Sequence, residues 1–530
     1  MTLTRRQLAL ALALTPGIGG KTISRAMTRN DLLGRSPQDF LKLGPEALVE
    51  DYRFTRAGAT TWWTGQKERL AAAERLQARL DPHGVTMVTS ADASYPERIE
   101  LYDPAPPGLL YFYGNLKLLQ ADTFAVLSSR GTSEAGMTQI EPIVRGKAPF
   151  DTRRLDGLMD EAGLDAIIAT SKHNVQYLLG GYRFFFFDTM DAMGTSRYLP
   201  AVVYRRGRPE ETVYVGCGME SFERDLGSLW PEALDLGNTG TQATARQVVE
   251  HLRRLGNGIR RVGLEAPFIP ADADRLIRAG LGNADVVDAT VPLERLRAIK
   301  TSAEIACLRQ ASEKVVASML ATFRACRPGE SKREIAERLR REEVCRGLVF
   351  DYCLITAGTS LNRAPSDQII ARGDIISLDS GANERGYIGD LCRMGVLGPP
   401  DNELEDLLGF VEEVQQAARR RVRAGAPGRD VVSIGHDLVA ASPHKPYTHY
   451  MAHGMGLVSH EAPRLADMPR FSYTGDDAAR PLEAGMVLSI ETTMAHRRRG
   501  FIKLEDTILV TEAGHEALGD GGRGWNVIEW

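Results

Sequence analysis

Two stretches near the C-terminus have the pattern of β-hairpins that bring acidic side chains together, and they constrain the fold more than any other feature. Residues 375–390 have the pattern strand, turn, strand. A symmetric turn centred between Glu384 and Arg385 would set Asp379 directly opposite Asp390. Directly opposed residues have Cβ atoms about 5 Å apart. The first hairpin therefore predicts two carboxylates in close contact.

Residues 486–505 repeat this arrangement. Met486–Glu491 and Phe501–Glu505 flank a loop around Arg498, so Glu491 falls opposite Glu505. Opposed carboxylates repel each other, and burial strengthens the repulsion. Two such pairs in strands that otherwise have the composition of a core therefore require a cation.

The alternative for one acidic pair is an ordinary solvated face, or one half of two salt bridges, and a β-bulge in either strand would break the register. Two pairs of the same geometry, with the glycine-flanked His453 between them, favour a metal site. Four carboxylates and one imidazole suit a pair of hard or borderline divalent ions better than a thiolate site would. Manganese is the expected metal, with cobalt, iron or zinc as alternatives.

The order, spacing and neighbours of these residues resemble the metal motifs of the pita-bread metallopeptidase superfamily, which includes methionine aminopeptidase, aminopeptidase P, prolidase and creatinase. The resemblance extends over about residues 148–530. The motifs that carry it are Asp379-Ser-Gly-Ala with Asp390, His449-Tyr-Met-Ala-His453-Gly-Met-Gly-Leu-Val-Ser-His460-Glu-Ala-Pro, Gly485-Met-Val-Leu-Ser-Ile-Glu491 and Ile502-Lys-Leu-Glu505-Asp-Thr.

This resemblance implies a ligand role for five residues. Asp379 would be a terminal ligand of one metal ion, and Asp390 and Glu505 would bridge both ions. His453 and Glu491 would complete the second site. A hydroxide held between the ions would be the nucleophile, because two cations lower the pKa of bound water.

The resemblance also implies roles beside the metals. Glu491 would shuttle a proton, His460 would steady the oxyanion that develops on the substrate carbonyl, and His449 would line the substrate pocket. A lone histidine is more often a solvated surface residue. Three histidines within twelve residues around Gly454 favour a site.

Three positions depart from the superfamily pattern. Asn362 stands where many peptidase members carry a substrate-binding histidine, Thr492 where proline is frequent, and Lys503 where arginine is frequent. None of the three removes a metal ligand. Asn362 would leave the scissile amide without an imidazole contact, so a non-peptide C–N bond or a lyase substrate is a second hypothesis.

Residues 148–292 have the alternating pattern of an α/β domain, with strand-like runs at 165–169 and 201–204. Their start, Asp151–Gly180, resembles that of a creatinase-type N-terminal domain, and Leu296–Ile305 resembles its junction with the catalytic domain. The aromatic run Phe184–Phe187 is interpreted as core packing, with a substrate wall or an interdomain or dimer contact as alternatives.

Residues 293–530 form the predicted catalytic domain. Ser302 is the expected N-cap of a first helix that ends near Arg327, and a second helix should start near Ser331. A third helix is expected over 403–423. These helices would cover the outside of a curved sheet that carries the ligands on its inner face.

Residues 1–147 form the remaining predicted segment. Its start, from Arg5 to Leu14, has a basic end and a short apolar stretch, as a secretory signal would. A helix, a tight glycine turn and a second helix is the simpler interpretation, and it resembles a helix-hairpin-helix element.

Sequence further along resembles the start of the bacterial DNA-processing protein A family, with Phe124–Ser128 as a first Rossmann strand and Arg130 in a phosphate loop. The resemblance stops near Gly146, and one βα step cannot bury its own faces. The DNA-related function of that family is therefore not transferred. A gene fusion, a recombination remnant or a misjoined reading frame would each explain this front part.

Composition limits the remaining function classes. A net charge of −4 argues against a general nucleic-acid-binding surface. Six cysteines without a CxxC pair are typical of reduced cytosolic thiols, and no apolar run reaches the ~18 residues of a membrane span.

The first hypothesis is a cytoplasmic dinuclear-metal peptidase that cleaves small peptides at Xaa-Pro bonds, with a homodimer implied by the resemblance. A DNA-binding module led by residues 1–147 is the third hypothesis, after the non-peptide enzyme.

Overall fold

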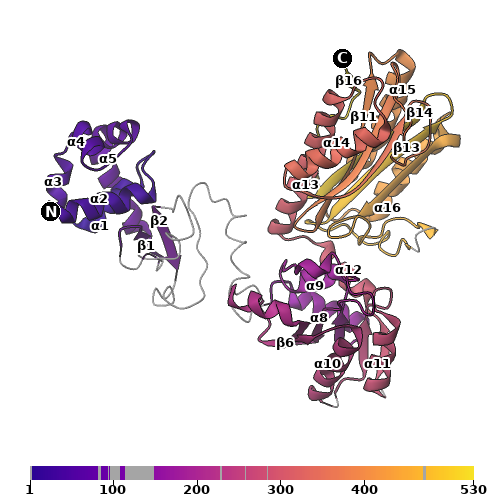
Figure 1. Ribbon diagram of the computed structural model, residues 1–530, viewed down its shortest axis with the longest axis horizontal. Helices are drawn as coiled ribbons and strands as arrows, with labels where there is room; N and C mark the ends of the chain where they lie inside the picture. Colours follow the sequence, from indigo (N-terminus) through magenta and orange to yellow (C-terminus); the bar gives the residue numbers. More distant parts are fainter. Residues whose placement is uncertain are drawn as a thin grey trace. The chain divides into compact units, whose positions relative to one another are not determined.

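The computed structural model describes residues 3–80, 85–92, 95, 108–113, 148–226, 229–256, 258–282, 284–469 and 473–530 (Figure 1). The chain divides into two compact units, residues 1–147 and 148–530. No helix of the described ranges combines the length and the apolar character needed to span a bilayer.

The first unit is mainly helical. Its elements are α1 (Arg5–Ala13), α2 (Gly20–Leu32), α3 (Pro37–Leu41), α4 (Pro45–Glu50), α5 (Arg56–Leu80), β1 (Val85–Thr89) and β2 (Leu109–Tyr113). Gly17 adopts a positive φ of 82° between the first two helices, as a tight turn requires. The predicted helix, glycine turn and helix are thus confirmed. The predicted Rossmann strand Phe124–Ser128 and its loop lie outside the described residues.

The second unit begins with a mixed six-stranded sheet in the order β6-β5-β4-β3-β7-β8. Its elements are α8 (Thr152–Glu161), β3 (Ala166–Ala169), α9 (Lys172–Leu178), η4 (Phe185–Phe187), β4 (Ala201–Arg205), β5 (Arg208–Cys217), η5 (Gly218–Leu226), β6 (Ala233–Asn238), α10 (Thr241–Arg254), β7 (Arg261–Leu264), α11 (Ala271–Leu281), β8 (Asp285–Asp288) and α12 (Thr290–Ala298). Phe184 and Phe187 are buried in its core, whereas Phe185 is exposed.

An eight-stranded sheet follows, with the main order β12-β13-β14-β11-β10-β9, while β15 pairs with β14 and β16 with β11. Helices α13 to α16 flank its strands (Figure 1). The elements are α13 (Ser302–Ala325), α14 (Lys332–Cys345), β9 (Val349–Ala357), β10 (Ile375–Glu384), β11 (Tyr387–Leu397), α15 (Asn402–Arg419), α16 (Gly428–Ala441), η6 (Lys445–Tyr447), β12 (Thr448–Gly454), β13 (Val487–His496), β14 (Gly500–Val510), β15 (His515–Leu518) and β16 (Asn526–Ile528).

The expected mixed α/β multidomain fold is confirmed, and the helix boundaries need small corrections. Thr301, rather than Ser302, caps α13 and forms a capping box with Glu304. Ser331 caps α14 as predicted. The third helix ends at Arg419, four residues before the predicted end.

Side chains alternate across this sheet, because successive residues of a strand point to opposite faces. Leu378 and Leu391 pack in one hydrophobic cluster with residues of α13 and α14. Leu504 packs in another with residues of α15. Their neighbours Asp379 and Glu505 therefore point to the opposite, inner face.

The predicted register of the β10–β11 hairpin is wrong by one residue on each strand. Asp379 pairs with Cys392, and Asp390 pairs with Gly381. The cause is the turn, which consists of Arg385 and Gly386, both at positive φ, rather than one centred on Glu384 and Arg385. Asp379 and Asp390 still share a face, as diagonal rather than direct neighbours.

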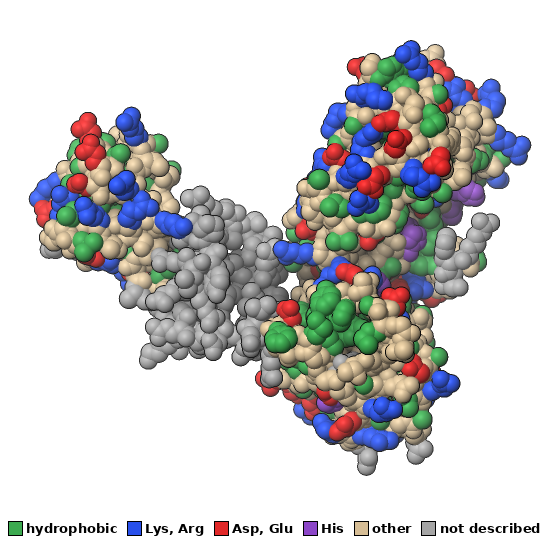
Figure 2. Space-filling view, in the orientation of Figure 1, with side chains coloured by type: hydrophobic (Ala, Val, Ile, Leu, Met, Phe, Trp, Pro, Cys, Tyr) green, Lys and Arg blue, Asp and Glu red, His purple; other side chains and the backbone are tan. Residues whose placement is uncertain are grey.

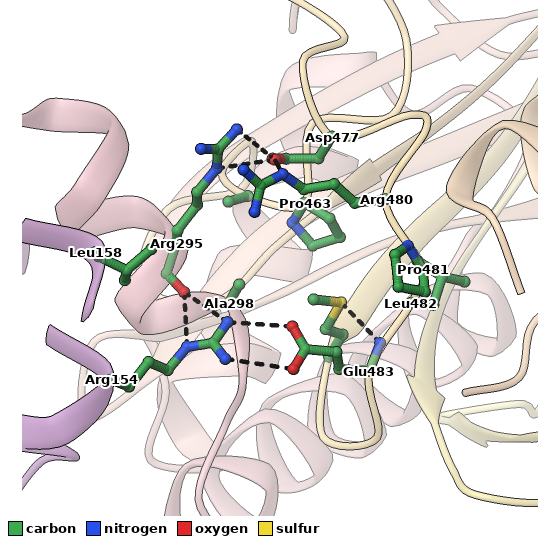
Figure 3. Close-up of a pocket in the computed structure, with 12 residues that line it drawn as sticks. Arg154, Leu158, Arg295, Ala298, Pro463, Asp477, Arg480, Pro481, Leu482 and Glu483 are labelled. Atoms are coloured by element: carbon green, nitrogen blue, oxygen red, sulfur yellow. Dashed lines mark hydrogen bonds and ion pairs between the residues drawn. The ribbon is translucent and has the colours of Figure 1, made fainter. Parts of the chain in front are cut away.

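Ion pairs join the six-stranded region to the rest of the unit (Figure 3). Arg154 of α8 lies 3.2 Å from the Glu483 carboxylate and donates to the Arg295 carbonyl at 3.3 Å. Arg295 of α12 in turn pairs with Asp477 at 2.9 Å. The cavity between these side chains is about 40 Å³, which is too small for a peptide.

Candidate metal centre

Two groups of potential ligands lie on the inner face of the eight-stranded sheet. The ligand atoms within each group lie within 4.8 Å of one another, and the groups are Asp379, Asp390 and Glu505, and His453, His460 and Glu491. All five residues predicted as ligands therefore belong to these groups. His460 joins the second group as a neighbour that the sequence assigned to the oxyanion.

Strand register explains why residues so far apart in the chain meet. The pairings Asp379↔Cys392, Cys392↔Glu505 and Glu505↔Glu491 place three carboxylates in one row across β10, β14 and β13. The predicted opposition of Glu491 and Glu505 is confirmed.

A second row lies two residues further along the strands. His453 pairs with Ser489, and Ser489 pairs with Thr507. The Thr507 hydroxyl reaches the Asp390 carbonyl at 3.5 Å. The inner face therefore presents four carboxylates and one imidazole from adjacent positions of five strands.

Burial makes this cluster electrostatically unfavourable without a cation. Asp379 is 2% and Asp390 3% exposed. Burial and neighbouring carboxylates raise the pKa of Asp379 and hold the pKa of Asp390 well above its usual range. Such strain marks functional sites.

Lys503 supplies one cation within the cluster. Its ammonium lies 2.7 Å from Asp379 Oδ2 and 2.8 Å from Glu505 Oε2, and it also pairs with Glu491. Burial opposes its charge, but these carboxylates raise its pKa well above the usual value. The sequence marked Lys503 only as a departure from the superfamily pattern, so this role was missed.

Three further residues contact the carboxylates and were also missed. The Tyr352 hydroxyl donates to Asp390 Oδ1 at 2.5 Å, and the Ser489 hydroxyl donates to Glu505 Oε1 at 2.8 Å. Arg363 pairs with Asp379 and lies over the Phe501 ring. Tyr352 lies on β9, which carries no motif of its own, whereas Arg363 directly follows Asn362 and was not assigned a role.

His453 provides the clearest sign that a metal fits. Its Nδ1 donates to the Gly454 carbonyl at 3.1 Å, and its buried Nε2 has no hydrogen-bond partner in the described part of the chain. Burial lowers its pKa to about 4, so the ring is neutral near pH 7. A neutral imidazole with a free lone pair beside several carboxylates is a ligand set for divalent metal ions.

His460 stacks on His453, with ring centroids 3.9 Å apart and planes 9° from parallel. Burial, and secondarily His453, lower the pKa of His460 to about 4. It lies beside the candidate ligands His453 and Glu491, and its role toward a substrate carbonyl stays a prediction.

The remaining two predicted residues lie outside the cluster. His449 is exposed on the same face of β12 as His453, four residues away. The Asn362 side chain accepts from the Ala364 backbone at 2.9 Å and so stabilises a turn. Its neighbour Arg363, rather than Asn362 itself, reaches the acidic group.

Fold and site together define a metal-dependent hydrolase of the pita-bread class. Residues 306–512 match metallopeptidase family M24, and residues 152–299 match the creatinase/prolidase N-terminal domain. These two matched domains support the pita-bread metallopeptidase superfamily, and the chain is a metallopeptidase.

Known relatives match about two thirds of the chain. The uncharacterized peptidase YqhT of Bacillus subtilis is 26% identical over 373 residues, which are 69% of this chain and 96% of that protein. The Xaa-Pro dipeptidase of Pyrococcus furiosus is 29% identical over 377 residues, again 69% and 96%. An Xaa-Pro dipeptidase from Bacillus anthracis has a solved structure with a TM-score of 0.59 and 24% identity, covering 71% of this chain and 99% of that one. This likeness shows a shared fold.

Proposed function

We propose that the protein cleaves small peptides at Xaa-Pro bonds with two divalent metal ions, manganese being the expected ion. The observation that carries the proposal is the buried cluster of four carboxylates with the unpartnered Nε2 of His453. The similarity to an Xaa-Pro dipeptidase at 29% identity supports the choice of substrate.

The proposed ligand roles follow the two rows of the sheet. Asp379 would serve as a terminal ligand, Asp390 and Glu505 would serve both ions, and His453 and Glu491 would complete the second site. Bound divalent ions would polarise the scissile carbonyl and acidify water. Lys503 and Arg363 hold Asp379 in place from two sides.

The substrate roles are assigned to residues beside the ligands. Glu491 moves the proton that the leaving nitrogen requires. His460 donates to the carbonyl oxygen as negative charge develops there. His449 and the Asn362 loop border the substrate, His449 from the outer end of β12.

One preparation tests both metal and substrate. Elemental analysis of protein purified without chelator should find about two Mn, Co, Fe or Zn per chain, and the same sample should cleave Xaa-Pro dipeptides. His453→Ala should lose this activity. Two bound metal ions without cleavage of these dipeptides would point to a non-peptide C–N bond or a lyase substrate. The similarity to Xaa-Pro dipeptidases does not support that alternative. No metal uptake would contradict the site itself.

Asp390→Asn tests the bridging assignment. Removing a group that hydrogen-bonds a metal ligand typically costs about 10–100-fold in metal affinity or activity. Removing a bridging ligand itself should therefore lower activity by more than about 100-fold. Metal content should fall with it. Asp406→Asn, on the exposed side of α15, is the matched control and should behave as the wild type does. Full metal content in Asp390→Asn would contradict the assignment.

We further propose a homodimer formed through the six-stranded region. That part of the molecule carries a hydrophobic patch (Figure 2), and its large exposed apolar side chains include Phe185, Met193, Met219 and Phe222, of which Phe222 is 78% exposed. Apolar patches of this kind mark contact surfaces. Light scattering should give twice the chain mass, and Phe222→Glu should lower it; an unchanged dimer would place the interface elsewhere.

The compartment and the division of the chain are also proposals. Six free cysteines support a cytoplasmic location. We propose residues 1–147, 148–292 and 293–530 as three domains. Nucleic acid is not a proposed partner, and a gel shift on single-stranded DNA by residues 1–147 at low salt would contradict that exclusion.

A further inference from the structure

A chain of buried polar groups runs from the six-stranded sheet to the loop that carries His460. Glu265, after β7, accepts from the Ser171 backbone at 2.9 Å and from Asn174 Nδ2 at 2.6 Å. Arg297 of α12 donates to Asn174 Oδ1. Arg297 also donates through Nε and a terminal nitrogen to Glu461 Oε2, at 3.2 and 2.8 Å.

Lys300 completes the set at its far end. Its ammonium donates to Glu461 Oε1 at 3.2 Å and to the Ala298 carbonyl at 3.2 Å. The side chains of Arg297, Lys300 and Glu461 are 4%, 1% and 1% exposed. Both oxygens of Glu461 are therefore held by cations away from water.

Glu461 is connected to both histidines of the site. It directly follows His460, whose ring stacks on His453. Its backbone N–H donates to the Gly454 carbonyl at 3.0 Å, and the same carbonyl accepts from His453 Nδ1. Arg297 and Lys300 anchor the Glu461 side chain, and the Glu461 backbone holds the carbonyl that orients the His453 ring. Groups that orient a ligating histidine tune metal affinity and activity.

A purely structural ion pair is the alternative. Burying several charges is costly, and apolar side chains of similar volume are often as stable or more stable. An apolar replacement would lose the fixed orientation of the Glu461 side chain, because the planar guanidinium of Arg297 binds Asn174 and Glu461 at fixed angles. The two interpretations predict different outcomes when the charges of Arg297, Lys300 and Glu461 are all removed together.

We propose that Arg297 is a positioning residue that, through Glu461, fixes the His453 and His460 rings in their working orientation, so that the six-stranded region takes part in the peptidase reaction. Asn174 and Glu265 hold Arg297 from the other side, and Lys300 keeps Glu461 from rotating. The role in catalysis rests on the proposed function, whereas the orientation of His453 does not.

Arg297→Met, Arg297→Lys and the triple variant Arg297→Met/Lys300→Met/Glu461→Met test the proposal. Misplacement of a catalytic group by about 1 Å can cost 10²-fold, so kcat should fall about 100-fold in Arg297→Met while KM changes little. Arg297→Lys should recover only part of kcat, because an ammonium cannot bind both partners in the same plane. The triple variant leaves no charge of this set unpaired, so it should regain thermal stability without regaining kcat. Recovery of both would show a structural role and overturn the proposal.

Arg295→Met is the matched control. Arg295 lies on the same helix and pairs with Asp477 (Figure 3), but within the described residues it forms no hydrogen bond or ion pair with Glu461. This variant should lose some stability and keep kcat. An equal fall in kcat in both variants would mean that any damage to the junction suffices, and the specific role of Arg297 would be wrong.

A readout without substrate separates this inference from the proposed function. In Co²⁺-loaded protein, the visible absorption bands report the geometry of the ligands. They should change in Arg297→Met and stay as in the wild type in Arg295→Met. This result would stand even if no Xaa-Pro peptide were cleaved. Unchanged bands together with unchanged kcat would overturn the positioning role.

Discussion

At the scale of single residues, Lys503 has the strongest consequence for how the metal centre forms. Its ammonium contacts Asp379, Glu491 and Glu505 at the bottom of the cluster. Without this ammonium, the metal-free protein would bury these three carboxylates with one fewer positive charge beside them. Removing one partner of a buried ion pair costs about 3–5 kcal/mol. Divalent ions would supply the missing charge.

Lys503→Met should therefore destabilise the metal-free protein by about 3 kcal/mol and leave the metal-loaded protein less affected. The rise in Tm on adding Mn²⁺ should be larger in this variant than in the wild type, as measured by calorimetry. Lys503→Arg keeps the charge and should show a rise close to that of the wild type. A smaller rise in Lys503→Met would mean that Lys503 helps to bind the metals instead.

At the scale of elements, the β10–β11 turn shows a conflict between sequence and backbone. Arg385 has φ 53° and Gly386 φ 91°, as both central residues of a type I′ turn require. Gly386 suits this conformation, but a side chain such as that of Arg385 does so at a cost of roughly 1–2 kcal/mol.

Arg385→Asn should stabilise the protein by about 0.5–1 kcal/mol, because asparagine is favoured at this position of the turn. The backbone carbonyl that Gln176 contacts at 2.7 Å is kept. Gly386→Ala should destabilise, since an added Cβ would lie 2.6 Å from an Arg183 nitrogen. Urea unfolding measures both changes, and a destabilising Arg385→Asn would show that the arginine side chain itself supports the turn.

The same turn shows what the sequence could predict. The β13–β14 register was predictable, because its loop is symmetric around Arg498 and His496 pairs with Gly500. The β10–β11 register was not, because a turn with Arg385 at positive φ is the less expected choice. Asp379 and Asp390 nevertheless share a face, as predicted. The pairing partner of each residue differs from the predicted one by two positions, and side chains alternate with a period of two.

Glu343 on α14 makes stability depend on pH. It is fully buried against β10, where the Ser380 hydroxyl donates to its Oε1 at 2.9 Å and Oε2 has no partner in the described structure. Burial raises its pKa to about 8, from 4.5 as the usual value. The folded protein therefore binds this proton more tightly than the unfolded chain, and stability falls as pH rises from about 4.5 to about 8.

Glu343→Gln should remove this loss. The variant and the wild type should be similarly stable near pH 5, and the variant should be more stable by a margin on the order of 3 kcal/mol at pH 9. Unfolding free energies at the two pH values give the comparison. Glu342→Gln on the same helix, which loses a pair with Arg346, is the control and should differ from the wild type equally at both pH values. A pH-independent difference in Glu343→Gln would contradict the raised pKa.

At the scale of the whole molecule, long-range contacts were the part that sequence could not predict. Motif spacing located the five proposed ligands, because each lies on a strand with a recognisable pattern. The buried polar groups that connect Glu265 through Arg297 to Glu461 come from distant parts of the chain. The bond between Arg297 and Glu461 joins residues 164 positions apart, and no local pattern predicts such partners. The junction segment that contains Arg297 and Lys300 was identified by resemblance alone, and its function became visible only through its contacts.

The division into two units leads to the last prediction, which concerns residues 1–147. The residues of the metal centre all lie between Tyr352 and Glu505, and the family matches begin at residue 152. Residues 148–530 form a compact unit with their own hydrophobic clusters, and such a unit can fold alone. A chain that starts at Ala148 should therefore keep its metal content, its Tm and its activity on Xaa-Pro dipeptides.

The matched comparison is the full chain carrying Leu10→Asp, which disrupts the buried core of α1 without changing residues 148–530. If the shortened chain loses activity while the Leu10→Asp chain keeps it, the front unit contributes to the enzyme through its presence rather than its fold. If both lose activity, residues 1–147 are a working part of the peptidase and not an appended segment.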